Sequence, residues 1–247
     1  MTTVATSRKT PTRPQWLGVA GRQLRIYLHL HVWLWVISLV GIATAIVVVD
    51  RVGTVDLSIA QFVRNGPLLW FLLAVATIIP TGSLTPHVAN GVTRRAFTGG
   101  SLVAALANSL LQASTAVVVM ALEGALYAAM GWQHDTASGS EPASGLWEQG
   151  YGILLLDYSV GATAGTVSGL LVGLAYYRFG GLLGTLCLPL ALAPVLVFLG
   201  LSSWGTASQD WLVDDFFGVA VTVGVVLAGA AVFALLLRNV RITRTET

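Results

Sequence analysis

Two adjacent arginines, Arg94 and Arg95, stand in a short polar interruption between two long apolar runs. The interruption begins at Pro86, and Gly91 lies three residues before the first arginine. The apolar runs on both sides are long enough to cross a bilayer, so we expect this stretch to lie at a membrane surface. The arginine pair therefore places fixed positive charge at that surface, and a partner could dock there.

Four polar residues lie inside the apolar runs and could contact a solute that crosses the membrane. A carboxylate at the bilayer centre costs about 2.5 kcal/mol or more on insertion scales. Counting about 20 residues outward from Gly99 puts one acid near the outer boundary instead, and a second acid at a similar depth. We favour interfacial acids and keep a substrate-pathway role as the alternative. The four candidates are Asn108, Gln112, Glu123 and Asp157.

Glycines recur at every fourth position in another apolar run. On a helix this spacing makes one continuous strip without side chains, and such strips let two helix backbones approach closely in lipid. We therefore expect this helix to pack against another helix, either within the chain or across a dimer. The strip consists of Gly161, Gly165, Gly169 and Gly173.

The composition excludes a soluble protein. Hydrophobic residues make up 55% of the 247 positions and charged residues only 10%, whereas a soluble domain carries roughly 25% charged residues. The mean hydropathy is +0.78. We therefore expect an all-α integral membrane protein with several spans. The single cysteine, Cys187, excludes a disulfide framework within one chain.

Membrane-spanning helices must therefore position these residues. The apolar runs predict a six-helix transmembrane domain over 27–237, and the prolines within the second and fifth runs predict bends there. The third run, which continues to Trp132, is too long for one straight crossing of a ~30 Å hydrocarbon core. The predicted spans are 27–49, 67–85, 98–122, 153–177, 182–201 and 217–237.

Flanking segments complete the layout. Residues 1–15 and 238–247 read as cytoplasmic tails, the first of them disordered. Between the first tail and the first span, 16–28 has an amphipathic pattern with Arg22 and Arg25 on its polar side. This segment is either a separate interfacial helix or the cytoplasmic end of the first span, and the pattern favours neither.

The distribution of basic residues predicts the orientation. Of the 13 Lys and Arg residues, only Arg51 and Arg64 fall on the side opposite the termini. Such a bias obeys the positive-inside rule, so both termini and the arginine pair are expected in the cytoplasm. The remaining eleven are Arg8, Lys9, Arg13, Arg22, Arg25, Arg94, Arg95, Arg178, Arg238, Arg241 and Arg244.

Catalytic motifs are absent from the sequence. There is no GxxxxGK[ST], HExxH, CxxC or GxSxG pattern. Ser168 lies in a span, as the nucleophile of an intramembrane protease would. It lacks the glycine two residues before it, and no histidine follows in a later span. We therefore expect no enzyme activity and no cofactor bound by this chain.

The layout resembles the permease subunit of a type 2 ABC transporter of the exporter kind. Such subunits have about 250 residues, six spans, both termini inside and no nucleotide-binding domain. The sharpest similarity is the segment Asn90-Gly91-Val92-Thr93-Arg94-Arg95-Ala96-Phe97, which is similar to the family's cytoplasmic coupling helix between the second and third spans. The loop before the sixth span is short and acidic, which departs from members with long external re-entrant helices.

This resemblance implies the roles of the segment. Gly91 would start or break the turn, and Asn90 and Thr93 would belong to the docking segment. Arg94 and Arg95 would face an ATPase or lipid phosphates, and Phe97 would pack at the membrane edge. The simpler interpretation is that the arginines only obey the positive-inside rule.

The resemblance also implies the partners. Two copies of an ABC ATPase would carry ATP and Mg, and a second permease copy or a paralogue would complete the pathway in a bacterial inner membrane. No nucleic-acid partner is expected. The few charges in the spans favour a hydrophobic or amphiphilic cargo. The alternative function is a non-transporting scaffold or sensor subunit that self-associates through the glycine strip.

Overall fold

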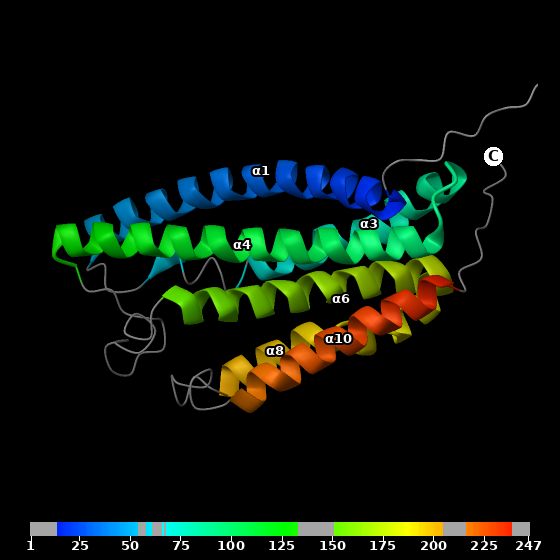
Figure 1. Cartoon of the computed structure of the whole chain (residues 1–247). Coiled ribbons are helices and arrows are strands. Elements are labelled where there is room, and N and C mark those ends of the chain that lie inside the picture. The colour runs from blue at the N-terminus through cyan, green and yellow to red at the C-terminus, as the bar shows by residue number, and fades with distance from the viewer. Residues whose placement is uncertain are drawn as a thin grey trace, which may run out of the picture.

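The computed structural model describes residues 14–53, 58–60, 66, 68–132, 151–204 and 216–238. All the regular elements among them are helices, which confirms the predicted all-helical class. Residues 1–13, 133–150 and 239–247 lie outside the described residues, and they include most of the two predicted tails, 1–15 and 238–247, and the connection between the third and fourth predicted spans. The helices are α1 (Gln15–Val52), α3 (Leu69–Ala89), α4 (Arg94–Met130), α6 (Tyr151–Leu186), α7 (Leu188–Ala191), α8 (Ala193–Trp204) and α10 (Phe216–Arg238), as Figure 1 shows.

Five of the described helices, α1, α3, α4, α6 and α10, are long and apolar enough to cross a membrane. They differ in how much of their surface the protein covers. In α6, 83% of the most apolar window is buried, against 11% in α1. The helix α6 is therefore the centre of the bundle and α1 lies at its periphery, as Figure 1 shows.

The fifth predicted span, 182–201, is divided into short pieces, so the prediction of six spans stays a prediction. The chain bends at Gly180, whose φ is 76°, and turns again at Cys187 and Leu192. The later breaks lie beside Pro189 and Pro194, which have no amide hydrogen to donate. The hydroxyl of Ser168 accepts a hydrogen bond of 3.1 Å from the amide of Val195. The buried serine thus stabilises the broken helix.

The first helix continues without interruption from Gln15 to Val52 over 38 residues. Residues 16–28 therefore form the beginning of this long helix and no separate element. The buried side chains include Val19, Gln23 and Tyr27 and continue to Trp35 and Ile42. Because this stripe runs past residue 28 with no proline or capping signal, nothing ends the helix there.

The glycine strip of α6 packs against helices of the same chain. A side chain at Gly169 would come within 2.2 Å of the carbonyl oxygen of Leu73, and one at Gly173 within 2.2 Å of the carbonyl oxygen of Thr77. At Gly165 the neighbour is Leu69, also in α3. Gly161 faces the ring of Phe198 in α8.

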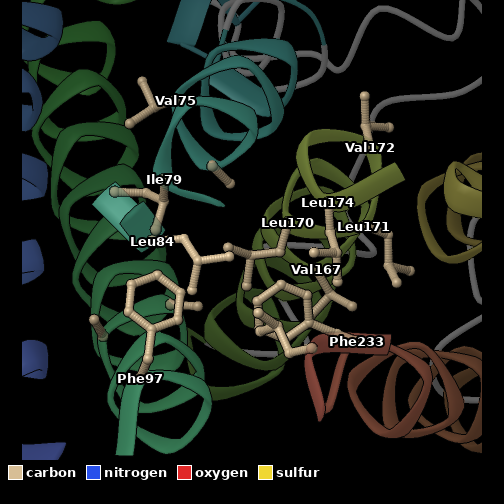
Figure 2. Packing of buried hydrophobic residues seen from close by; sticks show 14 of the residues in the cluster. Val75, Ile79, Leu84, Phe97, Val167, Leu170, Leu171, Val172, Leu174 and Phe233 are labelled. Atoms are coloured by element: carbon tan, nitrogen blue, oxygen red, sulfur yellow. The ribbon is translucent and has the colours of Figure 1, made fainter. Parts of the chain in front are cut away.

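The largest apolar cluster joins α3, α4, α6 and α10. Figure 2 shows Ile79, Leu84 and Phe97 facing the side chains of α6, with Phe233 of α10 on the other side. Phe97 and Phe233 are both fully buried. This cluster fixes the position of α4, and with it the position of the arginine pair.

Candidate functional site

The helices α1 and α4 begin, and α3 and α10 end, at one end of the bundle, on the right of Figure 1, and most of the described arginines belong to the helical turns near this end. Two hydrogen bonds tie these helix ends together. The side-chain oxygen of Gln15 accepts from the amide of Thr93 at 3.3 Å, and Arg94 reaches the end of α10. Within the described residues, the arginines on this side are Arg22, Arg25, Arg94, Arg95, Arg178 and Arg238, whereas Arg51 lies at the far end of α1.

The connection between α3 and α4 is a tight turn of residues 90–93. Gly91 has φ +80°, a conformation that glycine adopts at low cost, and this ends α3. The amide of Val92 donates to the carbonyl of His87 at 3.0 Å. Thr93 then caps α4 immediately, because its hydroxyl accepts a hydrogen bond of 3.2 Å from the amide of Ala96.

The segment 90–97, which resembles a coupling helix, consists of a turn followed by the first turn of α4. No helix lies between Ala89 and Arg94 in the described chain, and both arginines belong to the first turn of α4. The cause is the direct succession of the glycine that ends α3 and the threonine that caps α4. What remains exposed at this end of the bundle is the turn itself, with Asn90, Gly91 and Thr93, and the side chain of Arg95.

The two adjacent arginines have different surroundings. Arg94 is partly buried, and its guanidinium donates a hydrogen bond of 3.1 Å to the carbonyl of Arg238. Arg178 does the same at 2.8 Å to the carbonyl of Leu236. The last carbonyls of a helix have no partner within the helix, and a positive charge near them is favourable. Arg94 and Arg178 therefore cap α10, and of the adjacent pair only Arg95 is exposed.

Phe97 lies inside the bundle near the beginning of α4, and its expected place at the membrane edge stays a prediction. Its side chain is fully buried, and its ring meets that of His87 edge-on with centroids 5.5 Å apart. The reason is the helical period: Phe97, Ser101 and Ala104 share the buried face of α4. The residue therefore anchors α4 to α3.

A second group of polar residues lies between α1 and α4, which run in the same direction. Gln23 donates to the hydroxyl of Ser101 at 2.9 Å, and the indole of Trp35 donates to the side-chain oxygen of Gln112 at 3.2 Å. His31 Nε2 lies 3.2 Å from the hydroxyl of Thr115. Hydrogen bonds of this kind hold helices together in lipid, where apolar burial contributes little.

A small cavity of about 10 Å³ lies beside this group, close to the midpoints of α1 and α4. It brings together two of the predicted pathway residues, Asn108 and Gln112. The other walls are mostly apolar and come from α1 and α3. The lining residues are Tyr27, Leu30, His31, Phe71, Leu72, Val75, Asn108 and Gln112.

Glu123 and Asp157, the two acids among the predicted pathway residues, do not line this cavity. Glu123 is 5% exposed and accepts hydrogen bonds from the hydroxyl of Ser58 at 2.6 Å and from the amides of Ile59 and Ala60 at 3.0 Å. The carboxylate therefore fastens the segment after α1 to the outer half of α4. Asp157 is buried in α6, with 4% of its surface exposed.

No known family matched. Searches of family models, of curated proteins and of solved structures found nothing similar to this chain. The function must therefore be argued from the sites themselves. Within the described residues, no group of three or more His, Cys, Asp or Glu side chains could hold a metal ion.

Sequence reasoning missed Tyr27, His31 and Trp35. The signal was present, since Gln23, Tyr27, His31 and Trp35 recur at a spacing of four and so occupy one face of a helix. This face was difficult to recognise because α1 is apolar on its other sides as well. Only the packing of α4 against it distinguishes the buried side from the side that faces lipid.

Proposed function

We propose that this chain is the membrane-spanning permease subunit of an ABC exporter, with six spans and both termini in the cytoplasm. A separate ATPase would dock on the turn between α3 and α4 and transmit ATP-driven movement into the bundle. Two permease subunits, identical or paralogous, would form the pathway in a bacterial inner membrane.

The observation that carries the proposal is the exposed turn 90–93 with Arg95 at its edge, on the arginine-rich end of the bundle. A rigid turn between two spanning helices can transmit a movement of a docked partner to both helices at once. The buried ring of Phe97 would transmit such a movement into the core. Nothing in the sequence provides a nucleotide site in this chain, so the energy would come from the partner.

The alternative function, a scaffold that self-associates through the glycine strip of α6, is less well supported because that strip is already covered. It requires the glycine strip for self-association, but α3 and α8 of the same chain cover that strip. At Gly169 and Gly173 the backbone of α3 is already so close that a single added carbon would clash. A second copy could bind there only after α3 had moved away.

The test is the Arg95→Ala variant, purified with whatever ATPase accompanies the chain. Because Arg95 is exposed, the variant should insert and fold normally. We expect the coupled ATPase rate to fall about tenfold, which corresponds to roughly 1.4 kcal/mol. The control is Arg51→Ala, which removes the same charge at the opposite end of α1 and should leave the rate unchanged.

Two results would count against the proposal. One is the absence of any stoichiometric ATPase in mild detergent from cells that express the native chain. The other is an ATPase whose rate is the same in Arg95→Ala and in the native protein. Arg94→Ala is a poorer test, because it also removes the cap of α10.

A further inference from the structure

The cavity between α1, α3 and α4 carries polar atoms that have no hydrogen-bond partner in the described part of the chain. These are the hydroxyl oxygen of Tyr27, Nδ1 of His31 and Nε2 of Gln112. Tyr27 is 2% exposed and Gln112 is 3% exposed. An unsatisfied polar group in the hydrocarbon region of a membrane is costly, so these three atoms call for a ligand.

The neighbouring hydrogen bonds determine which of these atoms donate and which accept. The hydroxyl of Thr115 donates to the carbonyl of Leu111 at 2.9 Å, so its oxygen must accept from His31 Nε2. In this arrangement the neutral imidazole carries its proton on Nε2, and Nδ1 remains an acceptor with no hydrogen-bond partner among the described atoms. The side-chain oxygen of Gln112 already accepts from Trp35, so its amide nitrogen is a free donor.

The cavity therefore presents an acceptor on His31, a donor on Gln112 and a hydroxyl on Tyr27 that can do either. A ligand group that both donates and accepts one hydrogen bond complements this set. No Asp, Glu, Lys or Arg side chain lines the cavity. A charged group would thus find no counter-ion, whereas a neutral hydroxyl would find all its partners.

The volume of the cavity and its lining residues indicate which further groups a bound ligand could carry beside the hydroxyl. A volume of about 10 Å³ is close to that needed for one water-sized group. Leu30, His31 and Phe71 at the rim are only partly buried. Two of these three more exposed lining residues, Leu30 and Phe71, are apolar, so an aliphatic chain could extend past them along the bundle surface.

We infer that this cavity binds the hydroxyl group of a neutral amphiphile, with the alkyl chain lying between α1 and α3. Binding needs no ATPase. That such a molecule is also the cargo rests on the proposed function, and it would narrow the cargo to uncharged amphiphiles with a hydrogen-bond donor.

The experiment uses the full chain in phosphatidylcholine nanodiscs, because this lipid has no hydroxyl group of its own. The probe is a 1-dodecanol that carries a photoreactive diazirine on its chain. Its matched partner is the methyl ether of the same molecule, which can accept a hydrogen bond but cannot donate one to His31. After illumination, mass spectrometry locates the labelled peptides.

We expect the alcohol to label peptides that contain Leu30, Phe71 or Leu72 about fivefold more than the ether, the factor that one net hydrogen bond supplies. In Tyr27→Phe labelling by both probes should fall by a similar factor, because the lost hydroxyl can donate to the oxygen of either molecule, while the preference for the alcohol depends on His31 and should remain. This variant should fold, because the hydroxyl that it removes has no partner within the described protein. Tyr176→Phe, which removes a hydroxyl bonded to Thr185, is the control and should label like the native chain.

Equal labelling by alcohol and ether would overturn the inference, as would labelling of Tyr27→Phe by both probes that equals labelling of the native chain. Failure of both probes to label these peptides would also overturn it and would mean that the cavity holds only water. Selective labelling by a chain that has no ATPase partner would retain the binding site and reject the permease function, so the two failures are distinguishable.

Discussion

At the scale of single residues, the same side-chain type has different roles in different surroundings. Arg94 caps α10 while its neighbour Arg95 is exposed, although the sequence presents them as a pair. Glu123 is an acid in an apolar helix, which invites a pathway role. The carboxylate instead accepts hydrogen bonds from the hydroxyl of Ser58 and from two backbone amides. The role of each of these side chains therefore depends on its contacts in the fold and not on its residue type alone.

Glu123→Gln provides a test at this scale. The variant keeps the shape but loses the charge and one accepting oxygen, so the bonds to Ser58–Ala60 weaken. We expect a loss of about 2 kcal/mol, the range for hydrogen bonds to charged groups. Hydrogen–deuterium exchange in nanodiscs should show faster exchange at the amides of Ile59 and Ala60.

Ser58→Ala is the smaller matched change, because it removes only one of the bonds to the carboxylate. It should accelerate exchange less than Glu123→Gln does. If exchange in Glu123→Gln equals that of the native chain, the carboxylate does not hold this segment.

At the scale of helices, close backbone contact determines which elements pair. The strip of glycines lets α6 touch the backbone of α3, and the broken segment after Gly180 is held by Ser168 and by contacts with α10. The sequence predicted that α6 would pack closely against a neighbour. It could not identify α3 as that neighbour, because any helix with a suitable surface fits the same pattern.

Gly169→Ala tests this contact. The added carbon would lie 2.2 Å from the carbonyl oxygen of Leu73, so α3 and α6 must separate. We expect a destabilisation of about 2 kcal/mol, as for overpacked cores, measured as a lower midpoint of thermal unfolding in nanodiscs.

The matched control is Gly224→Ala in α10, where nothing lies within 4 Å of the added carbon. Alanine is a better helix former than glycine, so this variant should gain about 0.5–1 kcal/mol. If both glycine variants unfold at the same temperature as the native chain, α6 does not pack as described.

At the scale of the whole molecule, the end that carries most of the described arginines should face the cytoplasm. This orientation follows from the positive-inside rule. It places the turn 90–93 where an ATPase could reach it. The proposed function depends on this orientation more than on any single contact.

Cysteine accessibility tests the orientation in intact cells. Cys187→Ala provides a background without cysteine, since the chain has only one. In that background, Ser140→Cys should react with a membrane-impermeant maleimide added outside, and Asn90→Cys should react only after the membrane is opened. The reverse pattern would invert the topology and remove the basis for a cytoplasmic docking surface.

The sequence by itself indicated an all-helical membrane protein and the approximate positions of its long helices, and the resemblance implied a turn at Gly91. These properties are local: about 20 apolar residues in succession need a helix in lipid, and a glycine followed by a threonine cap ends one helix and begins the next. The sequence also indicated where a helix would break, through Pro189 and Pro194. The length of the apolar runs, their helical periodicity and the glycines and prolines near helix ends suffice for such conclusions.

Only the tertiary structure decided which residues meet. The bond from Arg94 to Arg238 joins positions 144 residues apart, and that from Trp35 to Gln112 joins positions 77 apart. Such pairs depend on the register between helices, which is set by side chains and close glycine contacts distributed over the bundle. The polar cavity exists because that register brings Tyr27 and His31 beside Asn108 and Gln112, and no pattern within one helix contains this information.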